Sequence, residues 1–63
     1  MDREIAQEYV NYRVGKGWTL HQIAQEHKMP TEFWHILQGF YGIFYMEQCV
    51  VDHIARQHAQ LNR

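Results

Sequence analysis

The sequence predicts an all-α fold, a compact domain of four helices. Apolar residues recur at helical spacing along most of the 63-residue chain, and no stretch shows the alternation of apolar and polar residues that is typical of a strand. A threonine cap, a proline and two pairs of glycines divide the chain into four helical stretches. A chain this short buries only about 60% of its unfolded surface, so we expect one domain that spans residues 1–63.

Capping residues bound the first two helices. A first helix of about 12 residues is expected between Asp2, a candidate N-cap, and Gly15, a candidate C-cap. Thr19 and Gln22 form a capping box, in which the threonine hydroxyl accepts from the Gln22 amide and the glutamine side chain accepts from the Thr19 amide. The second helix is therefore expected to begin at Leu20.

Pro30 separates the second helix from the third. A proline has no amide proton and disfavours helical geometry in the residue before it. The second helix must therefore end near His27 or Lys28, and a third can begin at Pro30 or Thr31. The sequence predicts a turn of three or four residues between them.

The final helix is expected to run from Ile43 to about Gln60, after a break that Gly39 and Gly42 bracket. The four residues that begin with Ile43 are all apolar or aromatic and point in four directions about 100° apart, so no single core can receive them. We expect one face of this helix on the domain core and a second face on another subunit, in a symmetric homodimer. A buried central helix is the alternative. The expected interface residues are Phe33, Ile43, Tyr45, Met46, Cys49 and Val50.

Residues 19–39, TLHQIAQEHKMPTEFWHILQG, resemble the helix-turn-helix of small bacterial and phage transcriptional regulators. In that family a small residue lies inside the first helix where the second helix crosses it, and Ala24 occupies this position. The apolar positions that join the two helices are matched by Ile23, Met29, Trp34 and Leu37.

Two residues of the turn depart from the family pattern. His27 stands where the family usually has an aliphatic residue, and Lys28 stands where it usually has glycine, which takes the left-handed conformation most easily. The resemblance implies a dimeric DNA-binding regulator of phage or plasmid type, whose second motif helix enters the major groove of double-stranded DNA while basic residues contact phosphates. The residues expected to contact DNA are Lys16, Lys28, Thr31, Glu32, His35 and Gln38.

Charge and aromatic content favour a rival class, a small protein-binding module such as an inhibitor or adaptor that uses the same scaffold without touching DNA. Six Lys and Arg against seven Asp and Glu give a formal charge of −1, whereas affinity for nucleic acid comes largely from basic groups. In this interpretation an exposed Phe33 is a protein-binding anchor. Trp34 and Phe40 are expected to be buried.

Cysteine and histidine usage gives no metal or catalytic motif. Cys49 and His53 lie four residues apart, the spacing of two metal ligands, but structural zinc needs four and no second pair is evident. With no phosphate-binding loop and no paired carboxylates, we expect no cofactor and no enzymatic activity. A single cysteine, an acidic N-terminus and the lack of an apolar run of roughly 20 residues predict a cytoplasmic protein without membrane contact.

Overall fold

The computed structural model describes residues 2–61, and over this range the chain forms three helices and no strand. Helix α1 is Asp2–Gly15, α2 is Leu20–Glu26 and α3 is Trp34–Leu61. The radius of gyration is 11.5 Å, close to the value of about 11 Å for a folded chain of this length. The predicted all-α class and compact shape are confirmed.

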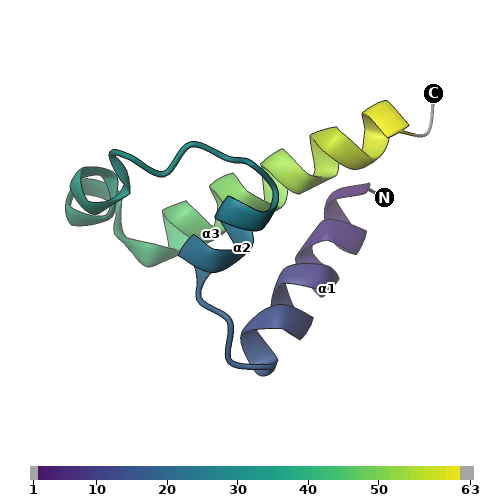
Figure 1. Cartoon of the computed structure of the whole chain (residues 1–63), viewed down its shortest axis with the longest axis horizontal. Coiled ribbons are helices and arrows are strands. Elements are labelled where there is room, and N and C mark those ends of the chain that lie inside the picture. The colour runs from purple at the N-terminus through teal and green to yellow at the C-terminus, as the bar shows by residue number, and fades with distance from the viewer. Residues whose placement is uncertain (1, 62–63) are drawn as a thin grey trace.

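Helix α3 is broken at Gly42, whose φ of 83° and ψ of 172° are not helical. Side chains with a Cβ are strained at positive φ, so glycine is the residue that lets the chain turn here. In Figure 1 the stretch before the break is seen end-on at the left, whereas 43–61 lies across the view. Because one residue makes the bend, the two helices expected on either side of it are one element, and the expected count of four helices is corrected to three.

Most of the core lies where α1 and α2 pack against the part of α3 that follows the break, and Trp34 joins it from the stretch before the break. Helix α1 runs beside the C-terminal half of α3, and α2 lies across this pair (Figure 1). The first turn of α1 meets the last turns of α3, where His58 Nε2 lies 4.0 Å from Asp2 Oδ1. The core side chains are Ala6, Val10, Ile23, Ala24, Trp34, Met46, Val50, Val51 and Ile54.

The predicted capping box starts helix α2. The Thr19 hydroxyl accepts from the Gln22 amide at 3.1 Å, and the Thr19 amide donates to Gln22 Oε1 at 2.9 Å. The expected start at Leu20 is therefore confirmed.

A Schellman motif ends the same helix. The Lys28 amide donates to the Gln25 carbonyl at 3.0 Å, and the Met29 amide donates to the Ala24 carbonyl at 2.9 Å. This motif places Lys28 in the left-handed region, with φ of 59°. The lysine thus occupies the conformation for which glycine is the usual residue.

The connection from α2 to α3 covers residues 27–33, and it is longer than the predicted three or four residues. The Trp34 indole donates to the Pro30 carbonyl at 3.1 Å, and the Trp34 amide donates to the Thr31 carbonyl at 3.2 Å. These bonds close a turn ahead of the helix instead of continuing a helix from Pro30. As a consequence, Thr31 and Glu32 precede α3 and do not lie in its first turn.

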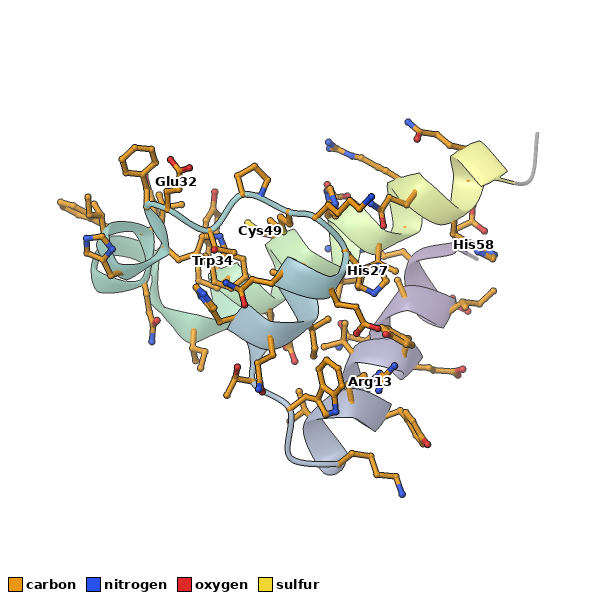
Figure 2. All side chains as sticks on the ribbon, in the orientation of Figure 1. Arg13, His27, Glu32, Trp34, Cys49 and His58 are labelled. Atoms are coloured by element: carbon orange, nitrogen blue, oxygen red, sulfur yellow. The ribbon has the colours of Figure 1, made fainter. Side chains whose placement is uncertain are left out.

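His27 joins all three helices (Figure 2). Its carbonyl accepts from His53 Nε2 at 3.1 Å and from Gln57 Nε2 at 3.0 Å, both on α3. Its ring lies between Gln57 Oε1, 3.2 Å from Nδ1, and the Tyr9 hydroxyl of α1, 3.3 Å from Nε2. Because the Gln57 oxygen only accepts, this geometry assigns the ring proton to Nδ1. His27 is therefore a polar junction of the fold.

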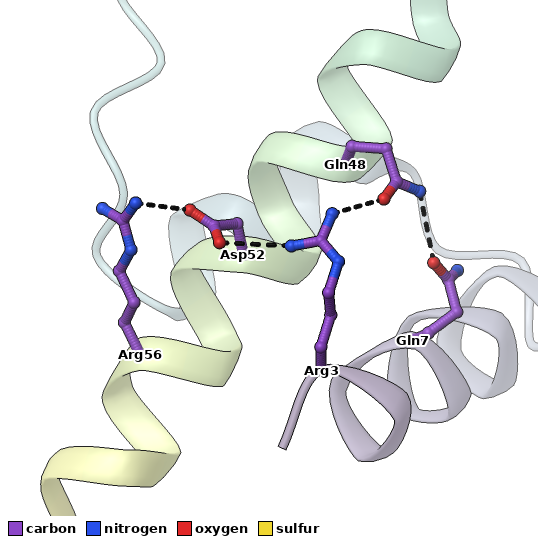
Figure 3. Close-up of polar contacts among 5 residues, drawn as sticks. All are labelled: Arg3, Gln7, Gln48, Asp52 and Arg56. Carbon is purple, nitrogen blue, oxygen red and sulfur yellow. Dashed lines mark hydrogen bonds and ion pairs between the residues drawn. The ribbon is translucent and has the colours of Figure 1, made fainter. Parts of the chain in front are cut away.

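A chain of polar contacts joins α1 to α3 on the exposed side of the pair (Figure 3). Asp52 accepts from Arg3 at 3.1 Å and pairs with Arg56 at 2.8 Å. Arg3 also donates to Gln48 at 2.6 Å, and Gln48 donates to Gln7 at 3.3 Å. Exposed pairs of this kind add little stability each, but they fix the register of α1 along 48–56.

Candidate functional site

Seven large apolar side chains are exposed around the start and the bend of α3. Phe40 and Phe44 are 80% and 71% exposed, although both are fully apolar. Large aromatic side chains present about 150–250 Å² each, so the exposed fractions of the seven side chains sum to roughly 700–800 Å² of mainly apolar surface. We call this the 33–45 surface. Its members are Phe33, Ile36, Phe40, Tyr41, Ile43, Phe44 and Tyr45.

The bend at Gly42 explains this exposure. Of the four residues that follow it, only Met46 reaches the core, at 2% exposure, while Ile43, Phe44 and Tyr45 point into solvent. Beyond the bend, α1 and α2 cover one side of α3 (Figure 1), whereas among residues 34–41, before the bend, Trp34 is the one buried side chain and it packs against His21 of α2. The start of the second stretch of α3 therefore projects from the domain.

Ring contacts hold part of this surface together. The Tyr41 ring lies 6.5 Å from Phe40 and 4.7 Å from Tyr45, centroid to centroid. A hydrogen bond with the Cys49 thiol raises the pKa of Tyr45 above its ordinary value of 10.0. The aromatic row thus continues along one side of α3 to the half-buried Cys49.

Five of the six expected interface residues divide into two groups, and the sixth, Cys49, is half-buried. Phe33, Ile43 and Tyr45 are exposed and belong to the 33–45 surface. Met46 and Val50, in contrast, are 2% and 1% exposed and lie in the core of their own chain, so we correct their expected place on an outer face. The reason is that α1 and α2 cover this side of α3, which leaves a second subunit no access to it.

Phe40 is a further correction. It was expected in the core with Trp34, and Trp34 is buried at 8% exposure. The Trp34 ring packs edge-on against His21 of α2, with centroids 5.7 Å apart. No described element covers Phe40, Ile36 or the other side chains on the far side of this short helical stretch. The interface expected from the sequence did not include Ile36, Phe40, Tyr41 or Phe44. The signal that could have found them was an excess of apolar residues over the area that two short helices can cover.

Three of the residues expected to contact DNA line one hollow of about 500 Å³, between the start of α2 and the first stretch of α3. They are Thr31, His35 and Gln38, and they share the hollow with apolar walls from Trp18, Leu20, Trp34 and Ile43. Glu32 does not line it and points outward (Figure 2). The site that these residues form is concave and mostly apolar, unlike a convex helix that enters a DNA groove.

Lys16 and Lys28 do not join this hollow. Lys16 lies in the connection before α2, with its ammonium 5.5 Å from the centre of the Tyr12 ring. Lys28 lines a different hollow of about 410 Å³, with Gln57 and Gln60 near the end of α3. The structure therefore does not bring the two lysines together with Thr31, His35 and Gln38.

The guanidinium group of Arg13 contacts three other residues of the chain. Its guanidinium carbon lies 4.3 Å from the centre of the Trp18 ring, and one of its nitrogens lies 3.6 Å from Glu26. Its Nε donates to the Tyr9 hydroxyl at 3.1 Å, and this hydrogen bond raises the pKa of Arg13 above its usual value. A phosphate would have to compete with these contacts.

No family model, curated protein or solved structure matches this chain. Among the described residues, no three His, Cys, Asp or Glu side chains gather as metal ligands, and no helix there is both long and apolar enough to cross a membrane. What the fold and the site define is an all-α domain with a covered core and an uncovered aromatic surface.

Proposed function

We propose that this chain is a small protein-binding module and that the 33–45 surface is its contact surface. The observation that carries the proposal is the exposure of seven large apolar side chains in one short stretch of a folded domain. The centres of protein interfaces are rich in aromatic residues and poor in charged ones, and a few aromatic anchors provide most of the binding free energy. Three Phe, two Tyr and two Ile give the 33–45 surface this composition.

The distribution of charge supports the same class of function. The sequence has no Lys or Arg between Lys28 and Arg56. The 33–45 surface therefore contains no Lys or Arg, and no Lys or Arg lines the hollow beside it. Binding to nucleic acid depends on such groups to neutralise phosphates. A protein partner with an apolar surface needs none.

A DNA-binding regulator of phage or plasmid type, acting as a dimer, is the second candidate. The packing at Ala24 favours it, because this alanine is fully buried and Ile23 and Trp34 lie in the same core, as the helix-turn-helix resemblance implies. In that case the first stretch of α3 would face the major groove. The contacts would come from Lys16, Lys28, Thr31, Glu32, His35 and Gln38.

Two tyrosines provide a matched test. Tyr41 on the 33–45 surface and Tyr12 on α1 are both 61% exposed. Crosslinking in the source cells is expected to join the wild-type chain and the Tyr12→Glu variant to the same partner, whether another protein or a second copy of the chain. Tyr41→Glu should lose that product while its helical circular dichroism stays unchanged. Equal crosslinking by both variants would refute the proposed contact surface.

A DNA titration distinguishes the DNA-binding regulator from the protein-binding module. Fluorescence anisotropy with random and selected duplexes, at two salt concentrations, should show no sequence-dependent binding by the wild-type chain. Sequence-dependent binding at low salt that Lys28→Ala weakens and Tyr41→Glu leaves intact would establish the regulator in place of the protein-binding module.

A further inference from the structure

We propose that the hollow of about 500 Å³ between the start of α2 and the first stretch of α3 is a binding site for a small, uncharged heteroaromatic molecule. The inference goes beyond the proposed function and does not rest on it, because the hollow and the exposed aromatic anchors use different sides of one helix. His35 and Gln38 line the hollow on the side that faces α2. By helical spacing Phe40 lies on the opposite side, in the 33–45 surface. Of the described residues, Ile43 alone belongs to both the hollow and this surface.

The hollow has the size and the lining of a small-molecule site. Such sites are concave, have volumes of about 300–1,000 Å³ and combine apolar or aromatic walls with a few polar groups. The Trp34 ring belongs to the lining and is held in place, since its N–H donates to the Pro30 carbonyl at 3.1 Å and its ring meets His21 edge-on. Trp18 adds a second indole. A planar aromatic molecule can pack against such rings in a stacked or edge-on arrangement, both of which are favourable.

Polar side chains at the hollow favour a ring that contains nitrogen over a plain hydrocarbon. Within the described part of the chain, Thr31, His35 and Gln38 line the hollow and form no hydrogen bond with another residue through their side chains. A hydroxyl, an imidazole and an amide can each donate and accept. A hydrocarbon would displace water from these groups and replace none of its hydrogen bonds, whereas a ring with an N–H or a ring nitrogen can replace at least one.

The charges around the hollow favour an uncharged ligand. No Asp, Glu, Lys or Arg is among the described residues that line it. The guanidinium carbon of Arg13 lies 4.3 Å from the centre of the Trp18 ring, so a cationic ligand would meet an indole that already has a cation beside it. An anionic ligand would find no Lys or Arg in the lining, and Arg13 is itself paired with Glu26 at 3.6 Å. A charged ligand of either sign would therefore lose hydration without gaining an ion pair.

An NMR titration of the ¹⁵N-labelled full chain with indole at pH 8 tests the proposal. Indole is the probe because it is planar, uncharged and has one N–H donor. Both tryptophans of the chain line the hollow, so their two side-chain N–H signals should shift and saturate, with a Kd of about 1 mM or tighter, as expected for a molecule of this size. If neither signal shows a saturable shift up to the solubility limit of indole, or if the shifts are confined to residues 39–45, the proposal is wrong.

Charged analogues with the same ring test the preference for an uncharged ligand. Indole-3-acetate and tryptamine should each bind the wild-type chain at least about 5-fold more weakly than indole, because each brings in a charge without a partner. Tighter binding of either analogue than of indole would overturn the proposal.

Two lysine variants test the place of the site. Gln38→Lys puts a cation at the hollow and should tighten the binding of indole-3-acetate about 5-fold or more. Gln25→Lys is the matched control, because Gln25 is exposed on α2 and does not line the hollow, and it should leave this affinity unchanged. His35→Lys replaces Gln38→Lys if the latter loses its helical circular dichroism. Equal effects of the hollow variant and the control would overturn the proposed place of the site.

The Tyr41→Glu variant separates this inference from the proposed function. It should lose the crosslinked product and still bind indole as the wild-type chain does, since Tyr41 does not line the hollow. Loss of indole binding in this variant, with its helical circular dichroism intact, would assign the binding to the 33–45 surface and overturn the inference. Indole binding at the hollow together with crosslinking that does not depend on Tyr41 would support the inference and refute the proposed contact surface.

Discussion

The two parts of α3 on either side of Met46 both contain adjacent apolar residues but have opposite surroundings. Val50 and Val51 are adjacent apolar residues, at 1% and 0% exposure, whereas Phe40 and Phe44 are larger and more than two thirds exposed. Hydrogen bonds and ion pairs from α1 and from His27 reach α3 at residues 48–58. Coverage by neighbouring helices, and not hydropathy, decides which apolar residues of this chain are buried.

The comparison also separates stability from function. The covered part holds the core, the capped α2 and the His27 junction, so changes there should alter the free energy of unfolding. Apart from Trp34, whose side chain lies in the core, the uncovered part contributes little to the fold of the single chain, so changes there should alter binding instead. Four substitutions test this division, from the largest expected effect to the smallest.

Two isoleucines give the sharpest contrast. Ile23 is fully buried and Ile43 is 64% exposed. Ile23→Ala should lower the free energy of unfolding by about 2–5 kcal/mol, because it leaves a cavity in the core, whereas Ile43→Ala should change it by about 0.5 kcal/mol or less. Urea denaturation at low protein concentration measures both, since self-association would otherwise add stability. If Ile23→Ala fails to fold, Ile23→Val should still show a loss of about 0.5–1.5 kcal/mol. Equal losses in the free energy of unfolding for the two alanine variants would refute the proposed division between residues that stabilise the fold and residues that bind.

Ala24 tests the closeness of α2 to its neighbours. It is fully buried, whereas Ala59 near the end of α3 is exposed. Ala24→Leu should overpack the core and cost about 1–3 kcal/mol, while Ala59→Leu should leave the midpoint of thermal unfolding nearly unchanged. An unchanged midpoint for Ala24→Leu would show that the core has room at this position and would weaken the helix-turn-helix candidate.

Thr19 tests the capping box. Thr19→Ala removes the hydroxyl that accepts from the Gln22 amide, and the free energy of unfolding should fall by about 1 kcal/mol. Thr19→Ser keeps the acceptor and serves as the control. Chemical denaturation should place the serine variant near the wild type; a loss as large as that of the alanine variant would assign the effect to the threonine methyl group instead.

Lys28 tests the other end of α2. Here a substitution is expected to raise the free energy of unfolding, whereas the previous ones lower it. Its left-handed conformation, with φ of 59°, costs a residue with a Cβ more than it costs glycine. Lys28→Gly should therefore stabilise the domain by roughly 0.5–1 kcal/mol. Lys16→Gly is the control, because Lys28 has a positive φ and Lys16 does not. A destabilised Lys28→Gly variant would show that the lysine side chain itself supports the fold.

Local signals in the sequence predicted the features that depend on a few neighbouring residues. The capping box of Thr19 and Gln22 defined the start of α2, and Gly42 was one of the two residues expected to bracket a break. Pro30 predicted that α2 must end before it, although the length of the connection was wrong. That error arose because the bonds of the Trp34 indole and amide to the preceding turn do not follow from the proline alone.

The sequence by itself determined the helical class, the caps of α2 and the excess of apolar residues after Gly42, because each depends on contacts or periodicities within a few residues. Only the tertiary structure decided which of those apolar residues are covered. The direction of the chain after Gly42 and the placement of α1 and α2 put Met46 and Val50 inside and left Phe40 and Phe44 outside. Burial is a property of distant segments that meet, and helical periodicity fixes only which residues share a face, not which face another helix will cover.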